Sequence, residues 1–179
     1  MPCTQTLSGL AKDCSGNIGG IKAVYIANFD DVASVAVSDG KVSGITMVTP
    51  AQGSAPKFKK YNFKPATGSM SSTLNKDLQA GTNYVSTDLV LQFNRMETTK
   101  RVEMTALAQG ELMVIVKDAN DVYWLLGRTE PVMASAGDGQ TGTARADGNR
   151  YTLTLQDNAE TFPYEILSTV ITTTIVDEL

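Results

Sequence analysis

The order of hydrophobic and polar residues along the chain predicts mainly β-structure. Residues 84–95 read YVSTDLVLQFNR, in which Leu89, Leu91 and Phe93 alternate with other residues, as in a half-buried strand. Residues 21–28 (IKAVYIAN) are rich in β-branched and aromatic residues, and residues 150–155 alternate again. We also expect strands at 58–64 and 66–77, where the alternation is weaker or the residues are more polar.

Two hairpins are predicted from turn residues that lie between β-prone runs. Residues 32–48 are interrupted by Asp39-Gly40, a pair that favours a type I′ turn. Residues 111–118 and 121–128 flank Ala119-Asn120. The stretch from Leu112 to Val116 is continuously apolar, so we expect both faces of this strand to be covered.

One helix and two long loops are expected between the strands. Residues 96–109 place apolar side chains at three- and four-residue spacing, and Gly110 follows as a helix stop; a strand is the alternative for this segment. Residues 49–56 are rich in Pro, Gly and Ser, and residues 129–149 hold four glycines and few large apolar groups, so both are expected to be loops. With roughly nine strands, the chain is expected to be one β-sandwich or barrel-like domain spanning 1–179.

The two ends of the chain are candidate assembly arms. We expect the N-terminal segment 1–20 to contact other subunits. The C-terminal arm 165–179 is β-branched and nearly uncharged until its acidic end. Such a segment needs a partner strand, either in its own sheet or in the sheet of a neighbour.

Composition excludes several classes of function. The 179 residues include no His, so a His-based metal site or catalytic triad cannot form. The net charge is −4, from 15 Lys and Arg against 19 Asp and Glu, which disfavours binding to nucleic acid phosphates. Lys57, Lys59, Lys60 and Lys64 are interpreted as the solvated face of a strand, with a nucleic-acid stacking platform as the alternative. No apolar run approaches the ~18 residues of a membrane span, so no membrane is expected.

The remaining residues with reactive side chains do not form a known catalytic or metal-binding motif. Cys3 and Cys14 are too few for a four-ligand metal site; reduced thiols in a cytoplasmic product are expected, with a disulfide as the alternative. Asp118 and Asp121 are interpreted as turn residues, and the Asp-Gly pairs at 138–139 and 147–148 lack the spacing of an EF-hand. We therefore expect no enzymatic activity, no metal and no cofactor.

The order of these elements resembles the tail tube proteins of tailed bacteriophages, and structural proteins of Bacteroidetes phages and prophages. The resemblance is carried by the strand and helix LVLQFNRMETTKRVEMTALAQG (89–110), the hairpin ELMVIVKDANDVYWLLGR (111–128) and the closing segment RYTLTLQDNAETFPYEIL (150–167). It implies a β-sandwich or barrel-like subunit that forms hexameric rings. In that family the rings stack, and their inner sheets join into a tube through which DNA passes.

The expected function is therefore that of a structural virion protein in the phage tail, assembled in the cytoplasm of the bacterial host. Its expected partners are other copies of itself and other phage tail proteins, with DNA only as transient cargo of the lumen. A head–tail connector, a capsid decoration protein, or a carbohydrate-binding β-sandwich with Trp124, Tyr123 and Tyr61 as stacking residues are the alternatives. The residues expected in contacts between subunits come from the two loops and the C-terminal arm: Gln52, Gly53, Ser54, Ala136, Gly137, Asp138, Gly139, Gln140, Ile171, Thr173 and Ile175.

Overall fold

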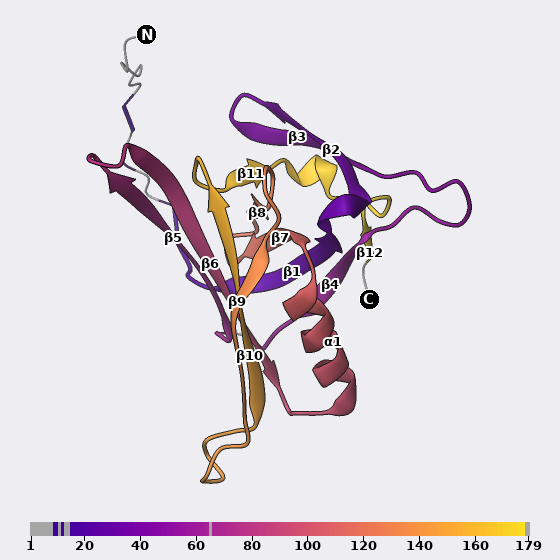
Figure 1. The fold of residues 1–179 in the computed structure, drawn as a ribbon, viewed down its shortest axis with the longest axis vertical. Coiled ribbons are helices and arrows are strands. Elements are labelled where there is room, and N and C mark those ends of the chain that lie inside the picture. The colour runs from indigo at the N-terminus through magenta and orange to yellow at the C-terminus, as the bar shows by residue number, and fades with distance from the viewer. Residues whose placement is uncertain (1–8, 11, 13–14, 65, 178–179) are drawn as a thin grey trace.

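The computed structural model describes residues 9–10, 12, 15–64 and 66–177, and within them it confirms a mainly β protein with one α-helix (Figure 1). The helix α1 spans Thr98–Gln109, and short 3-10 turns lie at Phe29–Asp31 and Ser168–Val170. The strands are β1 (Ile21–Asn28), β2 (Val32–Ser38), β3 (Lys41–Met47), β4 (Phe58–Asn62), β5 (Gly68–Asp77), β6 (Thr82–Asn94), β7 (Leu112–Asp118), β8 (Tyr123–Leu126), β9 (Met133–Gln140), β10 (Arg150–Ala159), β11 (Tyr164–Ile166) and β12 (Val176–Asp177).

The larger of the two sheets has eight strands in the order β12-β4-β1-β7-β8-β11-β3-β2. Its central strands β1 and β7 are apolar on both faces, and every residue from Leu112 to Val116 is buried. The prediction that this run is covered on both sides is confirmed. Side chains from β3, β4 and β12 meet Tyr25 and Ile115 in one cluster. Since these strands lie near opposite ends of the sheet, the sheet must curl around that cluster.

The smaller sheet has four strands in the order β5-β6-β10-β9, and all neighbours are antiparallel. It packs against the outside of the curled sheet, which gives the domain two β-layers (Figure 1). The contact is a cluster of branched aliphatic side chains, including Leu89, Leu91, Leu153 and Leu155 from the smaller sheet and Val24, Ile26, Val114 and Val116 from the larger one.

Local turn and helix chemistry agrees with the sequence. Asp39 and Gly40 adopt φ angles of 52° and 74°, as a type I′ turn requires, and they join β2 to β3. The helix forms as predicted, and Gly110 follows its last residue with φ −84°. A Cβ atom at this position would be crowded, at 3.0 Å from the Leu112 side chain and 3.2 Å from the Ala106 carbonyl oxygen.

One expectation needs correction. The segment 129–149 is not one long loop, because β9 lies within it and pairs with β10. Its small residues gave no hydrophobic pattern, but the pairing with β10 holds the strand. At Gly139 the lack of a side chain leaves room for the Tyr151 ring, which would lie 3.0 Å from a Cβ atom.

The C-terminal arm completes its own sheet: β11 pairs with β3 and β8, and β12 pairs with β4. Of the N-terminal segment, residues 9–10, 12 and 15–20 form no helix or strand, and the expectations for Cys3 and Cys14 fall outside the described residues. The loop at 49–56 is free of helix and strand, as predicted. No helix among the described residues has the length and apolar character needed to span a bilayer.

Candidate functional site

The acidic residues singled out in the sequence serve turns. The Asp118 carboxylate accepts hydrogen bonds from the backbone N–H groups of Asn120 (2.8 Å) and Val122 (3.0 Å) and from the indole of Trp124 (3.0 Å). Asp147 accepts the N–H groups of Thr143 (2.9 Å) and Ala144 (2.7 Å), which lowers the pKa of its carboxyl. Within the described part of the chain, His, Cys, Asp and Glu form no group of three that could hold a metal ion.

The aromatic residues considered for sugar stacking do not share a surface. Trp124 and Tyr61 pack against the cluster between the two sheets, whereas Tyr123 packs against the cluster inside the curled sheet. The Tyr61 hydroxyl donates to the Glu103 carboxylate, and burial together with this bond raises the pKa of Tyr61. These three side chains therefore cannot form one platform for a sugar.

The outward face of the four-stranded sheet is mostly polar. Cross-strand partners place their side chains on the same face, so rows such as Thr73–Ser86–Asn158 and Gln92–Thr152–Asp138 run across the sheet. Most of the face consists of Ser, Thr, Asn and Gln. The charged side chains on it are Asp77, Asp88, Asp138 and Arg150, and none is a lysine.

Both edge strands of this sheet are open in the sense that neither has a second strand partner among the described residues, although α1 approaches β9. β5 has ten residues and β9 has eight, and each pairs with one strand of the sheet. Val132, just before β9, forms a bridge with Leu112, but the outer edge of β9 has no strand partner in the described structure. Neither strand contains proline, and seven of the eight residues of β9 are exposed. Long unpaired edges of this kind are templates for pairing with another chain.

The two open edges run in opposite directions. In a four-stranded antiparallel sheet the first and last strands are antiparallel to each other, so β5 and β9 point opposite ways. A rotation about an axis roughly parallel to the strands therefore brings β5 of one copy beside β9 of the next as an antiparallel pair. The same rotation repeated can close a ring.

The residues predicted for subunit contacts lie in three separate parts of the structure. Ala136, Gly137, Asp138, Gly139 and Gln140 form the exposed second half of β9, at an open edge. They are thus well placed for a contact, although as a strand and not as the loop that was expected.

The other predicted contact residues lie elsewhere. Gln52, Gly53 and Ser54 are exposed in the loop between β3 and β4, away from the four-stranded sheet. Thr173 is exposed and Ile171 is half-buried, but Ile175 is 6% exposed in the core of its own subunit and offers no surface to a partner.

The sequence reading missed β5 as the second half of this surface. The run GSMSSTLNKD was expected to be an exposed strand, but nothing local in it shows that it lies at the edge of a sheet. The alternation of Ser and Thr with Met70 and Leu74 was the only local signal.

Comparisons of the chain with protein-family models, with curated proteins and with solved structures found no match. The two open edges and the polar face between them are therefore the features of the molecule that bear on its function.

Proposed function

We propose that the chain is a structural virion protein whose copies join edge to edge through the four-stranded sheet into a ring. Stacked rings, each of six copies, would form the tail tube of a bacteriophage, through which DNA passes. The observation that carries this proposal is the pair of open edges, β5 and β9, at opposite sides of one antiparallel sheet. Closing the four-stranded sheet across subunits pairs both of its edges and removes the tendency of such edges to aggregate.

The polar face of the same sheet supports a lumen for DNA. Its charged groups are Asp77, Asp88, Asp138 and Arg150, so it carries more negative than positive charge. Tight binding of nucleic acid needs several Lys or Arg side chains on phosphates. A face of hydroxyl and amide groups with a slight negative charge would let the phosphates of DNA slide past.

The experiment is electron microscopy and analytical ultracentrifugation of the purified full-length chain over a range of concentrations. We expect rings with a central hole. Thr73→Pro and Leu74→Pro form a matched pair. Backbone N–H groups along a strand alternate between its two sides, so one of these two N–H groups points toward β6 and the other toward the open edge. The variant that removes an N–H directed away from β6 should keep the thermal stability of the subunit and lose the rings.

A subunit that stays monomeric at every concentration tested would contradict the proposal. Rings that persist in both proline variants would show that the β5 edge is not the contact. The alternatives in the same class, a head–tail connector and a capsid decoration protein, predict single rings without stacking and attachment to capsids, respectively. Immunogold labelling of phage particles separates these from a tail tube, and glycan binding by a monomer would favour the carbohydrate-binding alternative.

A further inference from the structure

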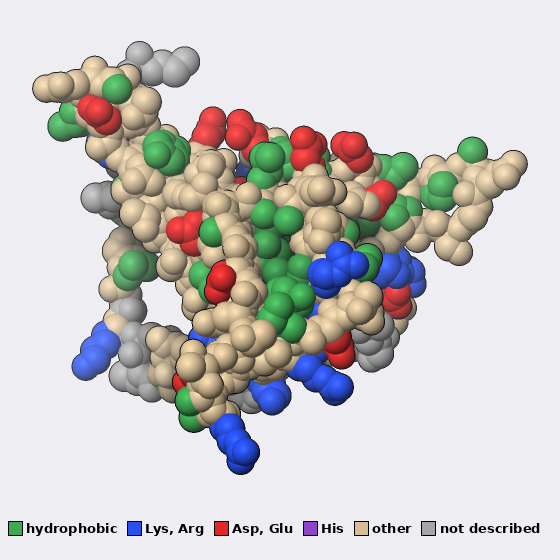
Figure 2. All heavy atoms as spheres, turned by 60° about the horizontal axis from the view of Figure 1, so that its bottom comes forward, with side chains coloured by type: hydrophobic (Ala, Val, Ile, Leu, Met, Phe, Trp, Pro, Cys, Tyr) green, Lys and Arg blue, Asp and Glu red, His purple; other side chains and the backbone are tan. Residues whose placement is uncertain are grey.

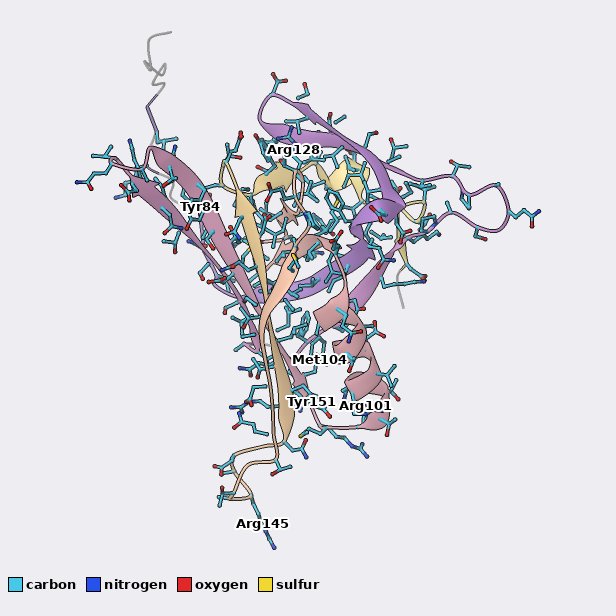
Figure 3. The ribbon with its side chains drawn as sticks, in the orientation of Figure 1. Tyr84, Arg101, Met104, Arg128, Arg145 and Tyr151 are labelled. Atoms are coloured by element: carbon cyan, nitrogen blue, oxygen red, sulfur yellow. The ribbon has the colours of Figure 1, made fainter. Side chains whose placement is uncertain are left out.

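Exposed apolar side chains gather at one end of the four-stranded sheet. Strands β5 and β10 end where β6 and β9 begin, so the connections at 78–81, 127–132 and 160–163 lie together. Figure 3 shows Tyr84 at this end and Arg145 at the other. We call this the apolar end, and its exposed members are Leu74 (52%), Leu78 (83%), Tyr84 (44%), Met133 (56%) and Phe162 (55%). Tyr84 and Met133 lie on the polar face of the sheet and Leu74 on the opposite face, so these residues share an end of the sheet and not one continuous patch. Exposed apolar residues at such a density indicate a contact with another molecule.

An apolar groove lies at the opposite end of the sheet, between α1 and β4. It has a volume of about 670 Å³, and Tyr61, Phe93, Met104 and Leu107 form its apolar lining. The charged residues in its lining are Lys59, Lys60, Lys100 and Glu103, and we call it the lysine-rimmed groove. Val85, which pairs with Ala159 near the apolar end, and Phe93 lie eight positions apart on β6, or roughly 27 Å at ~3.4 Å per residue.

The two ends also differ in charge. At the apolar end, residues 76–82, 127–133 and 159–163 contain three acidic and two basic residues. At the other end, residues 95–101 and 141–150 contain five basic and two acidic residues. Figure 2 shows Asp and Glu side chains along the upper margin of the molecule and Lys and Arg side chains mainly lower down.

Part of this charge is already paired within the subunit. Lys59 contacts Asp177 at 2.6 Å and Lys100 contacts Glu97 at 2.8 Å. The excess of positive charge at this end therefore comes mainly from arginines, namely Arg95, Arg101, Arg145 and Arg150.

We propose that the two ends meet between copies of this chain, with Phe162 of one copy inserted into the lysine-rimmed groove of the next. This inference rests on the proposed function, since it names the surfaces by which one ring stacks on another. Phe162 lies between Glu160 and Pro163, so an acidic group accompanies the ring and a proline stiffens the connection. The groove offers aromatic partners, because Tyr61 and Phe93 already pack edge to face with centroids 6.3 Å apart.

The proposed contact joins two different surfaces and therefore does not close on itself. Each copy keeps a free groove at one end and a free Phe162 at the other, so the contact repeats along the strand direction of the four-stranded sheet. That direction is also the axis about which the proposed ring closes. Phe162 and the groove residues lie outside β5 and β9, so the stacking contact can be removed without changing either edge strand.

Two variants and one control test the contact in the full chain. Phe162→Ser removes the inserted side chain, and Thr99→Trp fills the groove from an exposed position in its lining. Val102→Ser is the matched control, because Val102 is 54% exposed on the same helix and does not line the groove. We expect single rings from the first two variants and tubes from the control, with similar melting temperatures for all three.

Mixing the two defective proteins gives the sharpest result. Rings of Phe162→Ser keep the groove, and rings of Thr99→Trp keep Phe162, so a mixture can form one kind of contact and no longer chain. Electron microscopy should show paired rings that neither variant forms alone. Tubes of normal length from Phe162→Ser, or no pairing in the mixture, would overturn this inference and leave the ring intact. Absence of rings from the unmodified chain would overturn the proposed function as well.

Discussion

Asp157 places a carboxyl group, 4% exposed, near the end of β10. Burial raises the pKa of this group, the N–H of Gly127 partly opposes the shift, and nearby Glu130 adds to it. The folded state therefore binds the proton more tightly than the unfolded chain does. The stabilising effect of the proton is complete at acidic pH and is lost as the pH rises through the raised pKa.

Replacing Asp157 with Asn tests this effect. The amide oxygen can still accept the Gly127 N–H, and no charge is buried at neutral pH. We expect Asp157→Asn to melt at a higher temperature than the parent near neutral pH and to lose most of this advantage in acid, as thermal melts from about pH 4 to about pH 8 would measure. Asp138→Asn, at an exposed position on β9, is the control. An equal gain in the control would assign the effect to net charge.

Gly127 is required for both its conformation and its space. Its φ is +80°, and a Cβ atom would lie 2.9 Å from the Leu112 carbonyl oxygen and 2.9 Å from the Val132 side chain. Gly127→Ala should therefore lower the free energy of unfolding by more than the ~1–3 kcal/mol of a strained backbone alone. Gly53→Ala measures the backbone part, since Gly53 has φ +93° with nothing within 4 Å. If urea titrations give Gly127→Ala and Gly53→Ala the same midpoint, the contacts of the added Cβ atom at position 127 do not destabilise the protein.

Single residues were predictable from the sequence where their role is local. Asp118 was expected in a turn, and three donors within six residues of it satisfy its carboxylate. Asp157 gave no such signal, because its burial arises from the packing of β10 against the connection between β8 and β9. An acid that is buried by contacts distant in sequence looks like any other polar residue in an alternating strand.

At the scale of elements, the C-terminal segment is part of the subunit and not a free arm. Ile175 and Val176 are buried at 6% and 3%, and β12 pairs with β4 beside Phe58. Removing residues 171–179 should therefore lower the melting temperature of the subunit before any effect on assembly is seen. Thermal melts at a concentration below that of ring formation measure this. Unchanged melting with lost assembly would show that the segment acts between subunits instead.

Elements with a hydrophobic period were predictable and those without it were not. The run at 21–28 forms β1 with the same limits, and the helix expected at 96–109 forms at Thr98–Gln109. β9 reads MASAGDGQ, which has the composition of a loop. It is a strand because β10 supplies its hydrogen-bond partners. Nine residues, 141–149, separate β9 from β10, so the composition of β9 alone does not reveal this pairing.

At the scale of the whole molecule, the candidate site depends on the order of strands, which the sequence does not display. β5 and β9 become opposite edges only because β6 pairs with β10 across more than fifty intervening residues. The mainly β class followed from patterns within each strand, but the open edges, the polar face and the two unlike ends follow from how the strands are joined. The segments that had been expected to mediate assembly were chosen by composition, and one of them, the C-terminal arm, belongs to the fold.

The unlike charges of the two ends make a prediction about the rate of stacking. Opposite charges on approaching surfaces speed their encounter, and salt weakens this effect. Arg145→Glu at the basic end should slow tube growth, as light scattering would measure at low salt. Lys76→Glu at the apolar end should accelerate it, because that end becomes more acidic. Both variants change the net charge equally, so an effect of net charge would shift the two rates in the same direction. At low salt we expect one variant to grow more slowly and the other faster than the parent chain, and at high salt we expect the three rates to become similar. This result would show that the opposite charges of the two ends cause the effect.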